Sequence, residues 1–180
     1  MTMHVIDHAV EHLLHAVETT TTDEQYYLIP GLGLLTARYV APRSFMGETL
    51  RATRSLRSIR LLEVVHRRFD PDRELASGPN PYADPATLGH AEFEYRRKFC
   101  RPVDETAHRA WLAGGPSETD VHEAFSSLVK NAPSDGFSVA HLGRLEVGNK
   151  SVANDTLVWK VPVFVFSEEA QARVDLPRPL

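Results

Sequence analysis

Apolar residues recur with helical spacing near the start of the chain. Between residues 4 and 18 they fall on one side of a 3.6-residue wheel, and histidines and acids fall on the other. The apolar side consists of Ile6, Ala9, Val10, Leu13, Leu14 and Val17. This pattern predicts an amphipathic helix, ended by the β-branched threonines at 19–22, which disfavour helix.

Two stretches show strand patterning instead. Residues 26–29 and 34–40 flank the turn-forming sequence at 30–33, which predicts a hairpin over about 25–40. Residues 137–147 and 156–166 each alternate in polarity, and the loop at 148–151 joins them into a second hairpin, about 136–166. Pro162 cannot donate a ladder hydrogen bond, so its strand is expected at a sheet edge or at a bulge.

The middle of the chain favours helices. Residues 44–69 carry apolar residues on several sides, which predicts a long helix buried between layers. A Pro-rich loop is expected at 70–85, followed by helices at about 86–99, 103–113 and 118–131. Ser117 with Asp120 three residues later is an acidic variant of the capping box and marks the start of the last helix.

These elements predict an α+β fold. A single domain over residues 1–166 would hold a small antiparallel sheet, built from the two hairpins and packed by four to five helices. The length of 180 residues is typical of one domain. Residues 167–180 are polar and end in a Pro-containing run, so they are expected to form a mobile tail.

The composition limits the cellular compartment and the cysteine chemistry that can be expected. Cys100 is the single cysteine, so the chain can form neither an internal disulfide nor a multi-cysteine zinc site. The first residues do not resemble a secretory leader, and no apolar run is long enough to cross a bilayer. The sequence therefore predicts a cytoplasmic protein that does not engage membranes.

Histidines on the first helix are a candidate metal site. His8, Glu11 and His15 stand at i, i+3 and i+7, so two imidazoles and a carboxylate share one helical face. A divalent metal is the one cofactor that this pattern suggests. The alternative interpretation is a solvated polar face, because a metal site also needs ligands from other elements.

Arginines gather in one part of an otherwise acidic chain. Residues 43–68 hold seven arginines and two glutamates, a charge of +5, whereas the whole chain is −4 and the remainder is therefore −9. A nucleic-acid surface could use Arg51, Arg54, Arg57, Arg60, Arg67 and Arg68. On a helix, however, the three-residue spacing spreads the first four around half the circumference, which favours pairing with acids of the same chain.

Other candidate residues have simpler interpretations. Cys100 lies among basic residues that would favour its thiolate, with His90 or His108 as a base, but it lacks a supporting motif. His141 falls on the apolar side of its strand and is expected in the core. Trp111 is expected to be a core anchor.

The leading functional hypothesis is a non-catalytic binding or assembly protein, an accessory subunit or component of a larger complex. Its partner would be another protein chain or a second copy of itself. The first alternative is a metal-dependent or thiol enzyme that uses the histidine stripe or Cys100. The second is a small nucleic-acid-binding regulator that uses the arginines of 44–69. An enzyme is the less favoured outcome.

Overall fold

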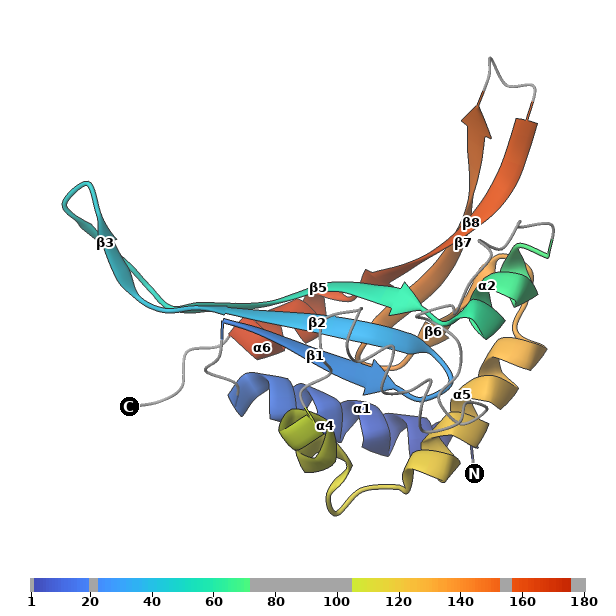
Figure 1. Ribbon diagram of the computed structural model, residues 1–180, viewed down its shortest axis with the longest axis horizontal. Helices are drawn as coiled ribbons and strands as arrows, with labels where there is room; N and C mark the ends of the chain where they lie inside the picture. The colour runs from blue at the N-terminus through green and yellow to red at the C-terminus, as the bar shows by residue number, and fades with distance from the viewer. Residues whose placement is uncertain (1, 20–22, 72–104, 153–156, 176–180) are drawn as a thin grey trace.

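The computed structural model of the protein describes residues 2–19, 23–71, 105–152 and 157–175. These residues form a mixed α+β fold, as the sequence predicts, but the two predicted hairpins lie in separate antiparallel sheets rather than in the single sheet expected. One three-stranded sheet has the order β1–β2–β5, another has the order β6–β7–β8, and β3 and β4 form a separate two-stranded ribbon. Figure 1 shows the ribbon and the β7–β8 hairpin projecting from the body in different directions.

Helix α1 (Thr2–Thr19) lies along one face of the first sheet (Figure 1). The six apolar residues predicted for its inner side are the six that are buried. Helices α4 (Glu105–Leu112) and α5 (Glu118–Asn131) pack against α1 in turn. The core therefore forms where these helices meet the sheet, and Trp111 is buried in it as expected.

The hairpin predicted for residues 25–40 is confirmed as β1 (Glu24–Ile29) and β2 (Gly33–Val40). Pro30 and Gly31 form its turn, closed by a hydrogen bond from the Leu32 N–H to the Ile29 carbonyl (3.0 Å). Gly31 has φ +80°, and a Cβ there would lie 2.8 Å from the His122 carbonyl oxygen. Only glycine allows this turn to approach α5 so closely.

The long helix predicted over 44–69 is wrong. This segment forms β3 (Arg43–Phe45), β4 (Glu48–Leu50), β5 (Thr53–Leu61) and the short helix α2 (Glu63–Phe69). In β5, Thr36 of β2 faces both Arg57 and Ser58, so the strand contains a β-bulge. The bulge puts the buried residues Leu56, Ile59 and Leu61 three and then two positions apart, and the first of these gaps imitates helical spacing.

The C-terminal sheet has one strand more than predicted. Residues 137–147 are split between β6 (Gly136–Val139) and β7 (Gly143–Val152), because the chain turns at His141, which has φ +61°. Strand β8 (Leu157–Phe166) then pairs with β7 through its whole length. It lies at the end of the strand order, which confirms the edge position predicted from Pro162.

Helix α5 begins and ends where the sequence predicts. The Ser117 hydroxyl accepts a hydrogen bond from the Asp120 N–H (3.1 Å) and donates one to the Asp120 carboxylate (2.7 Å). This capping satisfies an N–H group that the first helical turn leaves without a partner. The helix predicted at about 86–99 lies outside the described residues, as does the predicted loop 70–85 apart from its first two residues.

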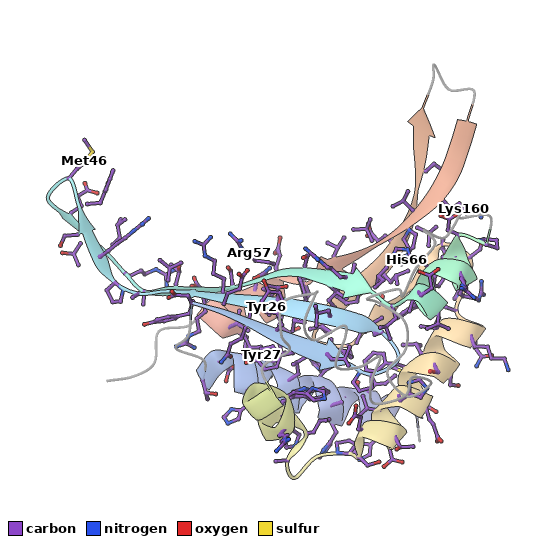
Figure 2. The ribbon with its side chains drawn as sticks, in the orientation of Figure 1. Tyr26, Tyr27, Met46, Arg57, His66 and Lys160 are labelled. Atoms are coloured by element: carbon purple, nitrogen blue, oxygen red, sulfur yellow. The ribbon has the colours of Figure 1, made fainter. Side chains whose placement is uncertain are left out.

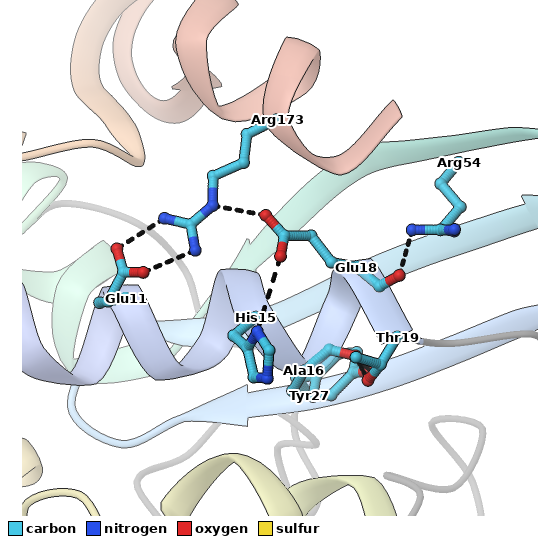
Figure 3. Close-up of polar contacts among 8 residues, drawn as sticks. All are labelled: Glu11, His15, Ala16, Glu18, Thr19, Tyr27, Arg54 and Arg173. Atoms are coloured by element: carbon cyan, nitrogen blue, oxygen red, sulfur yellow. Dashed lines mark hydrogen bonds and ion pairs between the residues drawn. The ribbon is translucent and has the colours of Figure 1, made fainter. Parts of the chain in front are cut away.

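The segment expected to be a mobile tail begins instead with a helix, α6 (Glu168–Asp175). Ser167 caps it by accepting a hydrogen bond from the Ala170 N–H (3.1 Å), and Ala170 and Val174 are buried in the core. Arg173 joins α6 to α1 by a bidentate contact with Glu11 (both 2.6 Å) and by a contact with Glu18 (2.5 Å) (Figure 3). These contacts therefore join α6, the helix that follows β8, to α1.

Candidate functional site

The β3–β4 hairpin, residues Arg43–Leu50 and hereafter the finger, is the most exposed apolar feature among the described residues. Figure 2 shows Met46 at its tip, away from the body of the protein. The side chains of Met46, Phe45 and Leu50 are 90%, 62% and 38% exposed. Large apolar side chains grouped in this way on a projection are typical of an interaction surface.

The finger has two unlike faces. Arg43 pairs with Leu50 and Phe45 pairs with Glu48, and residues directly opposite each other in an antiparallel pair lie on the same face. One face therefore holds Phe45, Leu50 and a pair of opposite charges. The other holds the small polar residues Ser44 and Thr49. A partner would recognise the first face by apolar contact with a charged border.

The tip has the geometry of a tight hairpin turn. Met46 and Gly47 both have positive φ, 51° and 83°, as the two central residues of a type I′ turn require. A tight turn of this kind limits the conformations of the finger before it meets a partner. Less conformational entropy is then lost on binding.

A second exposed surface lies at the base of β8. The β8 groove is a shallow depression of about 310 Å³ whose lining includes His141, Arg144, Glu146, Val165, Phe166 and Glu169. Val163 and Val165 beside it are exposed on the outer face of the sheet, where Val163 lies opposite Glu146. The lining therefore combines apolar side chains with charged groups of both signs.

His141 is exposed at the rim of this groove, and the expectation that it lies in the core is wrong. Its Nδ1 lies 3.2 Å from a carboxylate oxygen of Glu169 on α6. The residue stands in the turn between β6 and β7, so strand alternation does not decide the direction of its side chain. Arg144, on the next strand, lies 3.8 Å from the carboxylate of Asp135.

The predicted metal residues are engaged with other partners. Glu11 binds Arg173 through both carboxylate oxygens, and His15 Nδ1 lies 3.6 Å from Glu18 (Figure 3). The rings of His4, His8 and His12 follow one another along the helix, with centroids 5.1 and 5.7 Å apart. Within the described ranges, no three His, Cys, Asp or Glu side chains are grouped as metal ligands would be.

Arg173 also changes the titration of Glu11. The hydrogen bonds from this guanidinium hold the pKa of the Glu11 carboxyl below its ordinary value, and burial opposes them only in part. In the same contact, the pKa of Arg173 is raised, first by its hydrogen bond to Glu11. Glu11 is thus a carboxylate committed to a cation of its own chain.

The six arginines predicted to bind nucleic acid do not form one stripe. Arg51 and Arg54 contact α6 and α1: Arg51 binds the Asp175 carboxylate (2.6 Å), and the Arg54 guanidinium donates to the Glu18 carbonyl. Arg67 pairs with Glu63 on its own helix (3.4 Å). Arg57 and Arg60 lie exposed on β5.

Arg68 binds carbonyl groups at the end of α5. Its guanidinium donates to the carbonyls of Ala132 (2.7 Å) and Lys130 (3.5 Å), at the C-terminus of α5. Carbonyl groups at a helix C-terminus lack partners within the helix, so this contact stabilises α5. Arg51, Arg54, Arg67 and Arg68 therefore all make contacts within the chain.

Of the residues in the thiol hypothesis, the structure describes His108, whereas Cys100 and His90 lie outside the described residues. His108 is buried between α4 and α5 and accepts a hydrogen bond at Nδ1 from the Trp111 indole (3.1 Å). Its Nε2 lies 3.8 Å from Glu118, whose pKa is lowered chiefly by that histidine. His108 is thus held by a structural pair of contacts.

No known protein family, curated protein or solved structure matches this chain. The described part of the chain also contains no helix both long and apolar enough to span a bilayer. A functional inference must therefore rest on the geometry of this chain.

Sequence reasoning missed the finger, although one signal for it was present. Residues 45–48 read Phe-Met-Gly-Glu, and a Gly at the second central position suits a two-residue hairpin. The stronger signals for such turns are Asn-Gly and Asp-Gly. Without them, residues 44–50 fall within the helix that the apolar pattern predicts over 44–69.

Proposed function

We propose that this chain is a non-catalytic binding or assembly protein that engages a partner protein through the finger. The observation that carries the proposal is the exposure of Phe45, Met46 and Leu50 on a projecting hairpin. The chain buries its other large aromatic side chains of described placement at least in part. Phe45 is therefore an exception among these aromatic side chains, because it is exposed.

The free energy gained by burying the apolar side chains of the finger is large enough to support binding. Full burial of a Phe or Met side chain stabilises a complex by about 1.5–3 kcal/mol. Aromatic anchors seated in a pocket often dominate protein interfaces, whereas charged residues at the rim chiefly set specificity. In the finger, Phe45 would be the anchor and Arg43 with Glu48 would form such a rim.

A copurification experiment with matched variants tests this function. The double variant Phe45→Ser/Met46→Ser removes the apolar tip, and Val64→Ser removes an exposed apolar side chain from α2, away from the finger. Proteins that copurify with the wild type from its own cells are identified, and the affinity of each purified candidate is then measured. We expect the affinity to fall at least about tenfold in the finger variant and to stay unchanged in the control.

Circular dichroism and thermal unfolding establish that both variants are folded. A partner bound equally by the wild type and by the finger variant would contradict the proposal. So would the absence of any protein partner under conditions in which the wild type is folded.

A further inference from the structure

The finger joins the body through a gap in the strand pairing. Pairing between β2 and β5 ends at Val40 and Thr53, and pairing within the finger begins at Arg43 and Leu50. The register is the same on both sides of the gap. Residues 41–42 and 51–52, hereafter the junction, are all described and belong to no strand. The junction therefore lacks the backbone pairing that would fix the finger to the sheet.

Pro42 accounts for part of this gap. Continued register would place it opposite Arg51, but proline has no backbone N–H to donate to a ladder. A two-stranded ribbon also has little stability of its own without packing on one face, and every residue from Arg43 to Leu50 is exposed. The orientation of the finger relative to the body therefore depends on what holds the junction.

One carboxylate holds the junction from the side. Helix α6 lies against β5, and the Oδ2 atom of Asp175 in its last turn is 2.6 Å from the Arg51 guanidinium (Figure 1). The Oδ1 atom accepts a hydrogen bond from the Arg54 N–H (3.1 Å), and the Asp175 carbonyl accepts one from a second nitrogen of Arg51 (3.4 Å). Asp175 thus links a residue of the junction to the beginning of β5.

Helix α6 is itself fixed to the body at other points. Ala170 and Val174 are buried in the core, and Arg173 binds two glutamates of α1. A continuous series of contacts therefore runs from the body through α6 and Asp175 to Arg51 at the base of the finger.

The contact between Arg51 and Asp175 can open without damage to the fold. The two side chains are 62% and 31% exposed. An exposed ion pair contributes little to the stability of a protein, and dissolved salt screens it. The pair can therefore break while the sheet and α6 stay folded.

We propose that the junction is a hinge and that Asp175 latches it. When the Arg51–Asp175 pair is closed, the finger is held in the orientation of the structure. When the pair is open, the finger pivots on residues 41–42 and 51–52. A latched finger meets a partner in one orientation and loses less conformational entropy on binding. This role in binding rests on the proposed function of the finger, whereas the hinge itself needs no partner.

Pulsed electron paramagnetic resonance between two spin labels tests the latch in the full chain without a partner. The reference protein carries Cys100→Ser, which removes the single native cysteine. The labels are attached through Met46→Cys at the tip and through Glu123→Cys, an exposed position on α5. We expect one narrow distribution of distances between the labels at low salt.

Two variants open the latch from its two sides. Asp175→Ala removes the carboxylate, and Arg51→Met removes the guanidinium but leaves the hydrogen bond from the Arg54 N–H. Both should broaden the distribution of distances. High salt should broaden it in the reference protein but add nothing in Arg51→Met, because the ion pair is already absent.

Asp135→Ala is the matched control, because it removes the carboxylate of another exposed ion pair, with Arg144, outside the finger and its junction. It should leave the distribution unchanged. Circular dichroism and thermal unfolding establish that each variant is folded. If Asp175→Ala does not fold, Arg51→Met decides the test, since its side chain is the more exposed partner of the pair.

An unchanged distribution in Arg51→Met would overturn the latch. So would equal broadening in Asp135→Ala, since the finger would then respond to the loss of any surface charge.

Failure of the latch and failure of the proposed function give different results. We expect a partner found by copurification to bind Asp175→Ala more weakly than the wild type, but more tightly than Phe45→Ser/Met46→Ser. If the distribution broadens but no partner depends on Phe45 and Met46, the hinge stands and the proposed function fails. If such a partner binds Asp175→Ala as tightly as the wild type, the finger is the binding element and the role of the latch in binding is overturned.

Discussion

The side-chain amide of Gln171 makes with Leu56 the two hydrogen bonds that a neighbouring strand would make. Its Nε2 donates to the Leu56 carbonyl (2.8 Å), and its Oε1 accepts from the Leu56 N–H (3.1 Å). One helical turn later, the Asp175 carboxylate accepts from the Arg54 N–H (3.1 Å). Helix α6 therefore covers an edge of β5 that would otherwise present unpaired backbone groups.

Replacing Gln171 with Leu should destabilise the protein by about 1–3 kcal/mol, because both backbone groups of Leu56 lose their partner in a partly buried place. Urea denaturation monitored by tryptophan fluorescence measures the change. Gln171→Glu is the informative control. It keeps an acceptor for the N–H but places a second acceptor against the carbonyl, so it should not restore wild-type stability. A Leu variant as stable as the wild type would show that water replaces the amide without cost.

Gly31→Ala should be more destabilising than Gly114→Ala. The two glycines have nearly the same φ, +80° and +79°, but a Cβ at Gly31 would clash with α5, whereas a Cβ at Gly114 would have no atom within 4 Å. The backbone strain costs roughly 1–2 kcal/mol at either position, and overpacking adds about 1–3 kcal/mol at Gly31. Thermal unfolding of the two variants isolates the packing contribution, and equal losses would contradict the close approach of the β1–β2 turn to α5.

The Glu11–Arg173 contact should make stability depend on pH in the acid range. The pKa of Glu11 in the folded protein is lowered from 4.5 by the hydrogen bond with Arg173, so the unfolded chain binds this proton more tightly. The contact therefore contributes its full stabilisation above the unfolded pKa and loses it as pH falls through the lowered folded pKa.

Glu11→Gln measures this contribution. Because Glu11 is largely exposed, we expect the variant to be less stable at neutral pH by at most about 1 kcal/mol. The wild-type and variant stabilities should converge as the solution is acidified below about pH 4. Unfolding curves collected across this range give the difference directly. A difference that does not change with pH would assign the effect of the substitution to packing.

Met46 should be oxidised to its sulfoxide faster than Met3 under mild peroxide, because its thioether is the more exposed of the two. Peptide mapping by mass spectrometry gives both rates in one sample. Oxidation makes the tip polar, so it should weaken finger binding in the same direction as Met46→Ser. Preferential protection of Met46 in concentrated protein would also report that the tip is covered.

Much of the fold could be predicted because its helices follow simple periodicity. Helix α1 buries the six residues predicted from a 3.6-residue repeat, and α5 begins at the predicted cap. Strand β5 defeats the same reasoning, because the bulge at Arg57 and Ser58 breaks the two-residue alternation by which strands are recognised.

The candidate site was less predictable because its chemistry depends on what the fold leaves exposed. Phe45 and Met46 in sequence resemble core residues, and only the projection of the hairpin distinguishes them. Helix α6 carried a readable start signal in Ser167 followed by two glutamates, but its value lies in contacts with residues far away in sequence. No local pattern indicates that Gln171 will complete the hydrogen bonding of Leu56.

The edge cover of β5 has a consequence for biosynthesis. Leu56 and Gln171 are separated by 115 positions, so the strand leaves the ribosome long before the helix that completes it. At usual rates of translation this interval is on the order of ten seconds. Throughout that time, the nascent chain exposes backbone donors and acceptors that another nascent chain could pair with. Early protection by a chaperone would therefore matter for this edge of β5 until α6 has been made.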